Sequence, residues 1–191
     1  HDGLEADLEI LQLATQSLRA SHLTDFHVDL SHARILPALL AGHALTEVQH
    51  QSVTAALTHK NISAMRELGK QLPSNLAKAL LALVQMYGGL EVLTHAKTEF
   101  AAWPQVLKAL DELTWLAGHA DQAVSIDLAD LRGYAYYSGP RFSIFVPDTS
   151  DALVRGGRYD EIGAVFGRKR SAVGFSLDIK VLVGLLPHPQ P

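Results

Sequence analysis

Three short motifs that combine glycine with aromatic or cationic residues follow one another between residues 131 and 180. They read RGYAYYSG at 132–139, GGRYD at 156–160 and AVGFSLD at 172–178. Glycine lets a ligand approach the backbone closely, tyrosine offers a flat apolar wall with a hydroxyl at its tip, and arginine adds a permanent charge with a fork of donors. We expect each motif to form a bend, and the three bends together to hold a small polar ligand.

The composition bounds the class of protein that carries these motifs. A chain of 191 residues, 48% of them hydrophobic and 19% charged, is long and apolar enough to bury a real core. The net charge of −4 argues against a nucleic-acid-binding protein, and the absence of cysteine excludes disulfides and zinc–thiolate sites. No apolar run is long enough for a transmembrane helix, so we expect a soluble, cytoplasmic protein. Because the first residue is His1, we also expect the numbered chain to begin inside a longer protein.

Hydrophobic periodicity predicts the elements that must position the motifs. The expected strands are 26–30, 124–128, 142–146 and 152–154. The expected helices are 4–18, 76–86, 90–101, 104–117 and 179–186. Thr46 and Gln49 are spaced as a capping box, and Asp178 is placed to cap the last helix. Helices on one stretch and strands with short turns on others predict an α+β fold with antiparallel pairing.

Taken together, the three motifs resemble those of histidyl-tRNA synthetases. In that family the first motif reads RGLDYYTG and is specific for histidine, the second belongs to the same histidine pocket, and the third begins class II motif 3. The resemblance covers the whole chain in outline and implies an antiparallel sheet backed by helices. It divides the chain into a catalytic-domain remnant at 1–32 and 121–191, with its N-terminal part missing, and a helical insertion at 33–120.

Four departures separate this chain from an active synthetase. Where synthetase motif 3 has a glutamate and then an arginine that lies against ATP, the chain has Lys180 and Val181. Ala135 replaces an aspartate of the first motif, and Ser143 stands where a glutamate is expected. A valine side chain has neither donors nor charge with which to brace a polyphosphate. We therefore expect a histidine pocket that persists without its nucleotide site, and no catalytic residue.

The same residues resemble the family of ATP phosphoribosyltransferase regulatory subunits, which are synthetase paralogues without aminoacylation activity. That family often reads RGYxY, GGRYDxIG, FGR and GFSLD, and the chain has these motifs at 132–136, 156–163, 166–168 and 174–178. The resemblance implies a non-catalytic subunit that joins a short-form catalytic subunit in a hetero-oligomer, permits its activity and mediates feedback inhibition by L-histidine. We also expect self-association. We expect no cofactor, no membrane association and no nucleic-acid partner.

The resemblance also assigns roles to particular residues. Arg132 and nearby backbone would meet the carboxylate and amino group of histidine, Tyr137 and Tyr159 would wall its imidazole, and Gly157 would belong to the binding bend. Each has a plainer alternative, namely a surface cation, two core tyrosines with satisfied hydroxyls, and a turn glycine. Tyr136 is predicted to alternate away from Tyr137 and to enter the core.

The remaining candidates are weaker. The basic residues 168–170, with Arg168 and Arg170, would suit an acidic partner or a phosphate, although a solvated loop is the default. The ten histidines form no HExxH pattern, so no metal site is expected. Two alternatives to a regulator stay open, a fragment of an active histidyl-tRNA synthetase and a scaffold whose pocket is vestigial.

Overall fold

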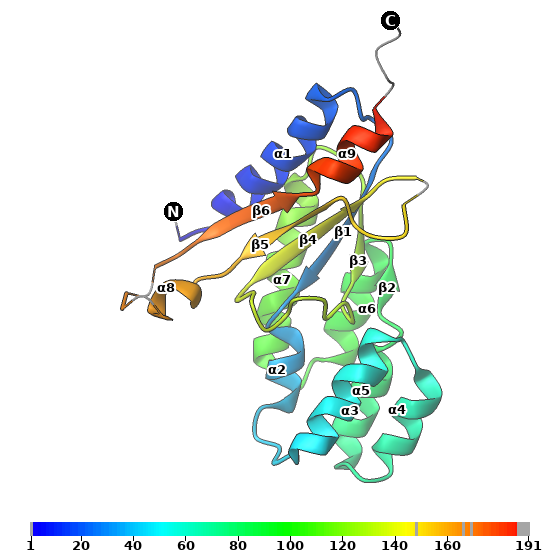
Figure 1. Cartoon of the computed structure of the whole chain (residues 1–191). Helices are drawn as coiled ribbons and strands as arrows, with labels where there is room; N and C mark the ends of the chain where they lie inside the picture. The colour runs from blue at the N-terminus through cyan, green and yellow to red at the C-terminus, as the bar shows by residue number, and fades with distance from the viewer. Residues whose placement is uncertain (1, 148, 166, 169, 187–191) are drawn as a thin grey trace, which may run out of the picture.

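A six-stranded mixed sheet organises the computed structural model of the chain, which describes residues 2–147, 149–165, 167–168 and 170–186 (Figure 1). In spatial order its strands are β2 (Tyr87–Gly88), β3 (Val124–Asp127), β1 (His27–His32), β4 (Pro140–Phe145), β5 (Val154–Arg158) and β6 (Val173–Leu177). The predicted α+β fold is confirmed, and the neighbours pair antiparallel except β1 and β3, which are parallel. Parallel strands need a long crossover connection, and the helical segment between β1 and β3 supplies it.

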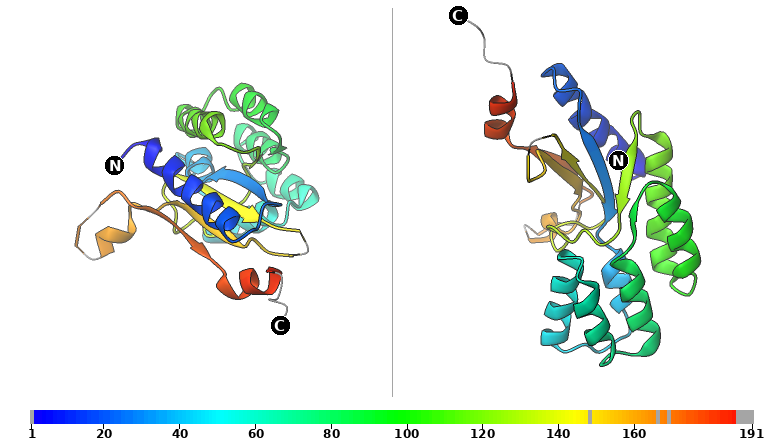
Figure 2. Two further views of the ribbon diagram at one scale, coloured as in Figure 1. Left: turned by 90° about the horizontal axis from the view of Figure 1, so that it is seen from above. Right: turned by 90° about the vertical axis from the view of Figure 1, so that its right-hand side faces the viewer.

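Two helices, α1 (Leu4–Ala20) and α7 (Pro104–His119), cover one face of the sheet (Figure 2). α1 packs against β5 and β6, whereas α7 packs against β1 and β4. The other helices are α2 (Ile35–Leu40), α3 (Glu47–Thr58), α4 (Ile62–Gly69), α5 (Ser74–Leu83), α6 (Glu91–Glu99), α8 (Ile162–Val165) and α9 (Ile179–Leu185). Among them α4 packs against both α3 and α5, at the lower end of Figure 1.

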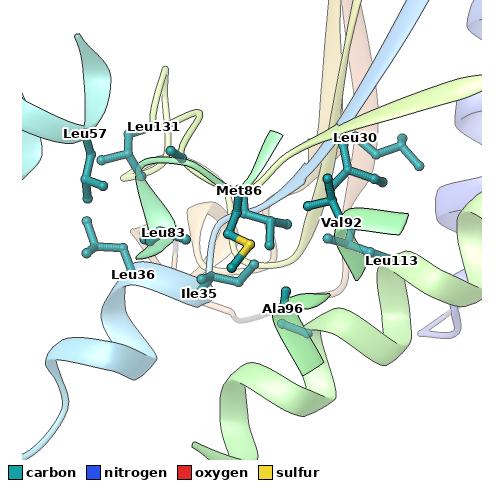
Figure 3. Packing of buried hydrophobic residues seen from close by; sticks show 14 of the residues in the cluster. Leu30, Ile35, Leu36, Leu57, Leu83, Met86, Val92, Ala96, Leu113 and Leu131 are labelled. Carbon is teal, nitrogen blue, oxygen red and sulfur yellow. The ribbon is translucent and has the colours of Figure 1, made fainter. Parts of the chain in front are cut away.

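The main core lies between the sheet and the helices that cover it. Val28, Ile144 and Val154 are register partners on three adjacent strands, and all three are buried. Leu30 of β1 and Leu113 of α7 belong to the same buried cluster, part of which Figure 3 shows. Because side chains alternate across a strand, the residues between these apolar positions lie on the opposite face of the sheet.

Both helix caps that the sequence predicts are confirmed. The hydroxyl of Thr46 accepts a hydrogen bond from the backbone N–H of Gln49 (3.2 Å), and the Gln49 side-chain oxygen accepts from the Thr46 N–H (2.9 Å). The Asp178 carboxylate accepts from the N–H groups of Lys180 (3.0 Å) and Val181 (3.1 Å) at the start of α9. Caps are readable from sequence because they depend on residues only two or three positions apart.

The bends predicted at the second and third motifs are wrong. Gly156 and Gly157 lie within β5, which begins at the last residue of the predicted strand 152–154 and runs on to Arg158, and Gly174 lies within β6. Close approach explains the two glycines of β5. A Cβ atom on Gly156 would lie 2.4 Å from Cζ of Phe142, and one on Gly157 would lie 2.6 Å from a backbone oxygen. The first motif does turn, with Gly133 at a φ of 70°.

Replacing Gly156 with alanine is expected to lower the free energy of unfolding by about 1–3 kcal/mol, because the added methyl group overpacks the ring of Phe142. Urea unfolding followed by circular dichroism measures the change. Gly118→Ala is the matched control, since no atom lies within 4 Å of a Cβ at that position near the end of α7. The control is expected to be neutral or stabilising, and equal losses in the two variants would contradict the steric explanation.

The helical segment is joined to the sheet by an ion pair. Nζ of Lys60, just after α3, lies 2.7 Å from Oδ2 of Asp127 at the end of β3. We keep the division of the chain into a sheet unit (1–32 and 121–191) and a helical insertion (33–120) as a proposal. Within the described residues, no helix has the length and apolar character needed to cross a bilayer.

Candidate functional site

The sheet face that points away from α1 and α7 carries a row of polar side chains. One register row runs across four strands from Asp29 of β1 through Ser143 and Arg155 to Ser176 of β6. Ser143 is buried on this face, whereas Arg155 is partly exposed. Because the opposite face packs its apolar residues against the helices, this polar, open face is the candidate site for a polar ligand.

Asp130 ties the first motif to this face. Its carboxylate accepts hydrogen bonds from Nε of Arg132 (2.9 Å), from the Arg132 backbone N–H (3.0 Å) and from the guanidinium of Arg141 on β4. Burial opposes the charge of Asp130, but the hydrogen bonds and positive charges of both arginines outweigh it, so its pKa is lowered. Arg141 itself is only 4% exposed. The segment that bears the tyrosines is therefore anchored to the sheet by a buried charge cluster.

Three tyrosines and one arginine line a pocket of about 230 Å³ at the β5–β6 end of the face. The Tyr136 ring centroid lies 5.2 Å from that of Tyr137, edge to face, and 5.1 Å from that of Tyr159. The floor includes Gly174, where a Cβ atom would lie only 2.6 Å from the hydroxyl oxygen of Tyr159. Arg155 also lines the pocket. Aromatic walls with one cation suit a small flat ligand that carries an anionic group.

Burial also acts on Tyr137. It raises the pKa of the phenol, and the nearby charges of Arg141 and Arg155 oppose that shift. The hydroxyl therefore stays protonated near neutral pH, where it is able to donate a hydrogen bond to a ligand.

The structure brings some of the residues predicted from the sequence together and separates others. Tyr137 and Tyr159 line the pocket. Gly157 of β5 is the register partner of Gly174 on the neighbouring strand β6, and Gly174 lines the pocket. Arg132 does not line the pocket, because its guanidinium pairs with Asp130 and lies 5.3 Å from the ring centroid of Phe145. Histidine binding by these residues stays a prediction.

Among the pocket residues that were not predicted as site residues are Tyr136 and Arg155. Tyr136 was predicted to be a core residue, which is wrong, since it is 45% exposed and packs against both other tyrosines. Strand alternation does not apply to it, because the first motif is a turn. The side of the sheet on which Arg155 lies could have been predicted from the sequence. Once β5 is recognised as a strand, Arg155 and Gly157 must share one face, while Gly156 and Arg158 share the other.

The other basic residues lie elsewhere. Arg158 points to the helix side and forms a buried ion pair with Asp7 of α1. Arg168 and Arg170 are exposed and do not line the tyrosine pocket, and Lys169 between them lies outside the described residues. In the described part of the chain, no group of three His, Asp or Glu residues is placed to hold a metal ion.

The chain is similar to curated proteins named ATP phosphoribosyltransferase regulatory subunit. It is 53% identical to the ATP phosphoribosyltransferase regulatory subunit of Albidiferax ferrireducens over 188 residues, which is 98% of this chain and 49% of the relative. It is 53% identical to the protein of the same name from Variovorax paradoxus, over 98% of this chain and 50% of the relative. The chain thus spans about half the length of the curated relatives it matches.

Two solved structures share the fold. A Bacillus halodurans protein described as an ATP phosphoribosyltransferase regulatory subunit/histidyl-tRNA synthetase aligns with a TM-score of 0.84 and 28% identity, over 98% of this chain and 51% of its own. The histidyl-tRNA synthetase of Nostoc sp. PCC 7120 aligns with a TM-score of 0.75 and 22% identity, over 95% and 46%, respectively. These likenesses confirm the expected class II synthetase-like architecture. A family model described as histidyl-tRNA synthetase matches residues 1–182, and this chain therefore belongs to the histidyl-tRNA synthetase family.

Proposed function

We propose that the chain is part of a regulatory subunit of ATP phosphoribosyltransferase. Such a subunit would be required for the first step of L-histidine biosynthesis and for its feedback control by histidine. The observation that carries this proposal is the 53% identity, over 98% of the chain, to relatives that bear this name. The tyrosine pocket supports it, because a space of about 230 Å³ between aromatic rings suits an imidazole amino acid.

The end of the third motif supports a non-catalytic role. Where the resemblance leads us to expect an arginine against ATP, α9 carries Val181, a partly exposed apolar side chain. Lys180 beside it is also exposed. Because phosphoryl and adenylate chemistry depends on positive groups that hold the developing charge, loss of that arginine favours binding of an amino acid without its activation.

Regulation would follow from ordinary linkage between two binding events. If L-histidine binds one arrangement of the assembly more tightly than the other, it biases the catalytic partner by the difference in affinity, typically about 1–3 kcal/mol. The proposed partner is a short-form catalytic subunit of the transferase. Self-association and a cytoplasmic location stay predictions.

The test uses the full-length protein together with a short-form catalytic subunit. We expect the two to co-purify, the transferase to be active only in the complex, and added L-histidine to inhibit it. A transferase that is equally active alone would contradict the proposal. Histidine-dependent ATP–pyrophosphate exchange by the full-length protein would instead support the alternative, an active histidyl-tRNA synthetase, which the description of the matching family model favours.

The vestigial-pocket alternative needs its own measurement. Tyr159→Ala removes one wall of the pocket, so we expect it to weaken L-histidine binding and feedback inhibition together, while the complex still forms. Isothermal titration and the inhibition assay measure the two effects. Unchanged inhibition with a defective pocket would show that the pocket has no regulatory role.

A further inference from the structure

We propose that Arg155, and not Arg132, binds the carboxylate of the ligand in the tyrosine pocket, so that this residue makes the pocket selective for an imidazole amino acid over analogues without the acid group. This inference rests on the proposed function, because it concerns the same pocket and the same class of ligand. Among the described residues that line the pocket, Arg155 is the one cation. A guanidinium is the side chain best suited to grip a carboxylate through two parallel hydrogen bonds.

The position of Arg155 suits this role. It stands on β5 between Ser143 and Ser176 of the flanking strands, and its side chain is 36% exposed, so a ligand is able to reach it. Arg155 lines the same pocket as Tyr137 and Tyr159, and its positive charge opposes the rise that burial causes in the pKa of Tyr137. A ligand ring among the tyrosines would thus have its acid group beside a fork of donors.

The present partner of Arg155 is exchangeable. The guanidinium pairs with Asp151, whose side chain is 69% exposed. Ion pairs between exposed groups contribute only about 0–1 kcal/mol, so a ligand carboxylate is able to replace Asp151 at little cost. Asp151 then acts as a weak competitor that occupies the anion site when no ligand is bound.

The two other nearby arginines are engaged elsewhere. Arg132 donates to Asp130 through Nε (2.9 Å) and Nη2 (3.3 Å), and its guanidinium lies over Phe145. Arg141 is buried, pairs with the same aspartate and lies 5.6 Å from the ring centroid of Tyr137. Arg132 would have to abandon a buried carboxylate to meet the ligand. Arg141 has an Nη1 atom without a hydrogen-bond partner, but its side chain is buried and does not line the pocket. Arg155 lines the pocket and gives up only an exposed carboxylate.

Isothermal titration of the full-length protein with L-histidine and with L-histidinol tests this assignment, since histidinol keeps the imidazole and the amine but lacks the carboxylate. We expect the parent to prefer histidine. Arg155→Gln is expected to weaken histidine binding by about 10- to 100-fold, the range for loss of hydrogen bonds to a charged group, and to leave histidinol binding unchanged. Arg66→Gln, an exposed arginine on α4, is the matched control and is expected to change neither affinity.

A second variant is expected to increase the affinity for histidine, an effect that a loss of folding could not produce. Asp151→Asn removes the competing charge, so it is expected to tighten histidine binding several-fold without affecting histidinol. Loss of the histidine preference in Arg132→Gln, with the preference intact in Arg155→Gln, would overturn the inference and return the carboxylate to Arg132. If the parent binds neither compound, the proposed histidine effector fails and the inference fails with it; an unchanged preference in Arg155→Gln defeats the inference alone.

Discussion

Replacing Asp130 with alanine is expected to lower the free energy of unfolding by about 3–5 kcal/mol, the range for breaking a buried ion pair by removal of one partner. Asp130 is the carboxylate that neutralises Arg141, whose side chain is only 3% exposed. Without Asp130, that charge stays buried with no other carboxylate paired to it among the described residues. Urea unfolding at neutral pH measures the loss. Because the same carboxylate holds the first motif against the sheet, L-histidine binding should be lost as well.

The control for this variant is an ion pair at the protein surface, between Lys97 and Asp111. Asp111→Ala removes the partner of Lys97 (2.7 Å), but the Asp111 side chain is 70% exposed. We expect this change to reduce stability by less than about 1 kcal/mol. Comparable losses in the two variants would mean that burial is not what makes Asp130 important.

The pH dependence of Asp130 has a definite sign. Its pKa in the folded protein is lowered from the ordinary value of 3.8, so its contribution to stability is present above pH 3.8 and is lost as the pH falls through the folded-state pKa. The stability difference between the parent and Asp130→Asn is therefore expected to narrow at acid pH. A difference that stays constant across this range would contradict the lowered pKa.

The second large effect is expected at Asp7, where alanine should again cost about 3–5 kcal/mol of unfolding free energy. Asp7 of α1 accepts hydrogen bonds from Nε (3.1 Å) and Nη2 of Arg158 on β5, and both side chains are buried. Arg158 would keep only the backbone oxygen of Gly3 (2.9 Å) and a longer contact with Asp160 (3.4 Å). Chemical unfolding measures the loss, and Glu9→Ala, an exposed carboxylate on the same helix, should stay within about 0.5 kcal/mol of the parent.

A double variant separates the charge from the packing at this pair. Burial raises the pKa of Asp7, although the hydrogen bonds and charge of Arg158 oppose that shift. Replacing both partners with apolar residues, as in Asp7→Leu with Arg158→Met, should regain most of the stability lost in Asp7→Ala, because neither charge of the pair is left buried without the other. Asp160 loses its 3.4 Å contact with Arg158 but still accepts a hydrogen bond from the Ala172 N–H (3.0 Å). If the double variant is less stable than either single variant, the pair stabilises the fold through its charges.

Local features of this protein were determined by the sequence alone. The capping box at Thr46 and the cap at Asp178 were predictable because each depends on hydrogen bonds between residues that are two or three positions apart. The spacing of apolar residues predicted α1, α5, α6, α7 and α9 and the strands β1, β3 and β4, but not α2, α4, α8, β2 or β6. The three motifs in their order were enough to indicate the family, because a motif is recognised by its residue types and needs no coordinates.

Only the tertiary structure decided which side chains meet in the pocket. The direction of Arg132 is set by Asp130, which also holds Arg141 from a different strand. Tyr136 joins the other aromatic rings because its segment turns across the sheet instead of extending as a strand. Arg155 enters the pocket because β5 continues past Val154 and pairs with β4 and β6 in a register that sets Arg155 beside Ser143 and Ser176. Side-chain direction in a turn, and the residue at which a strand begins, depend on contacts between segments far apart in the chain, and no local pattern encodes those contacts.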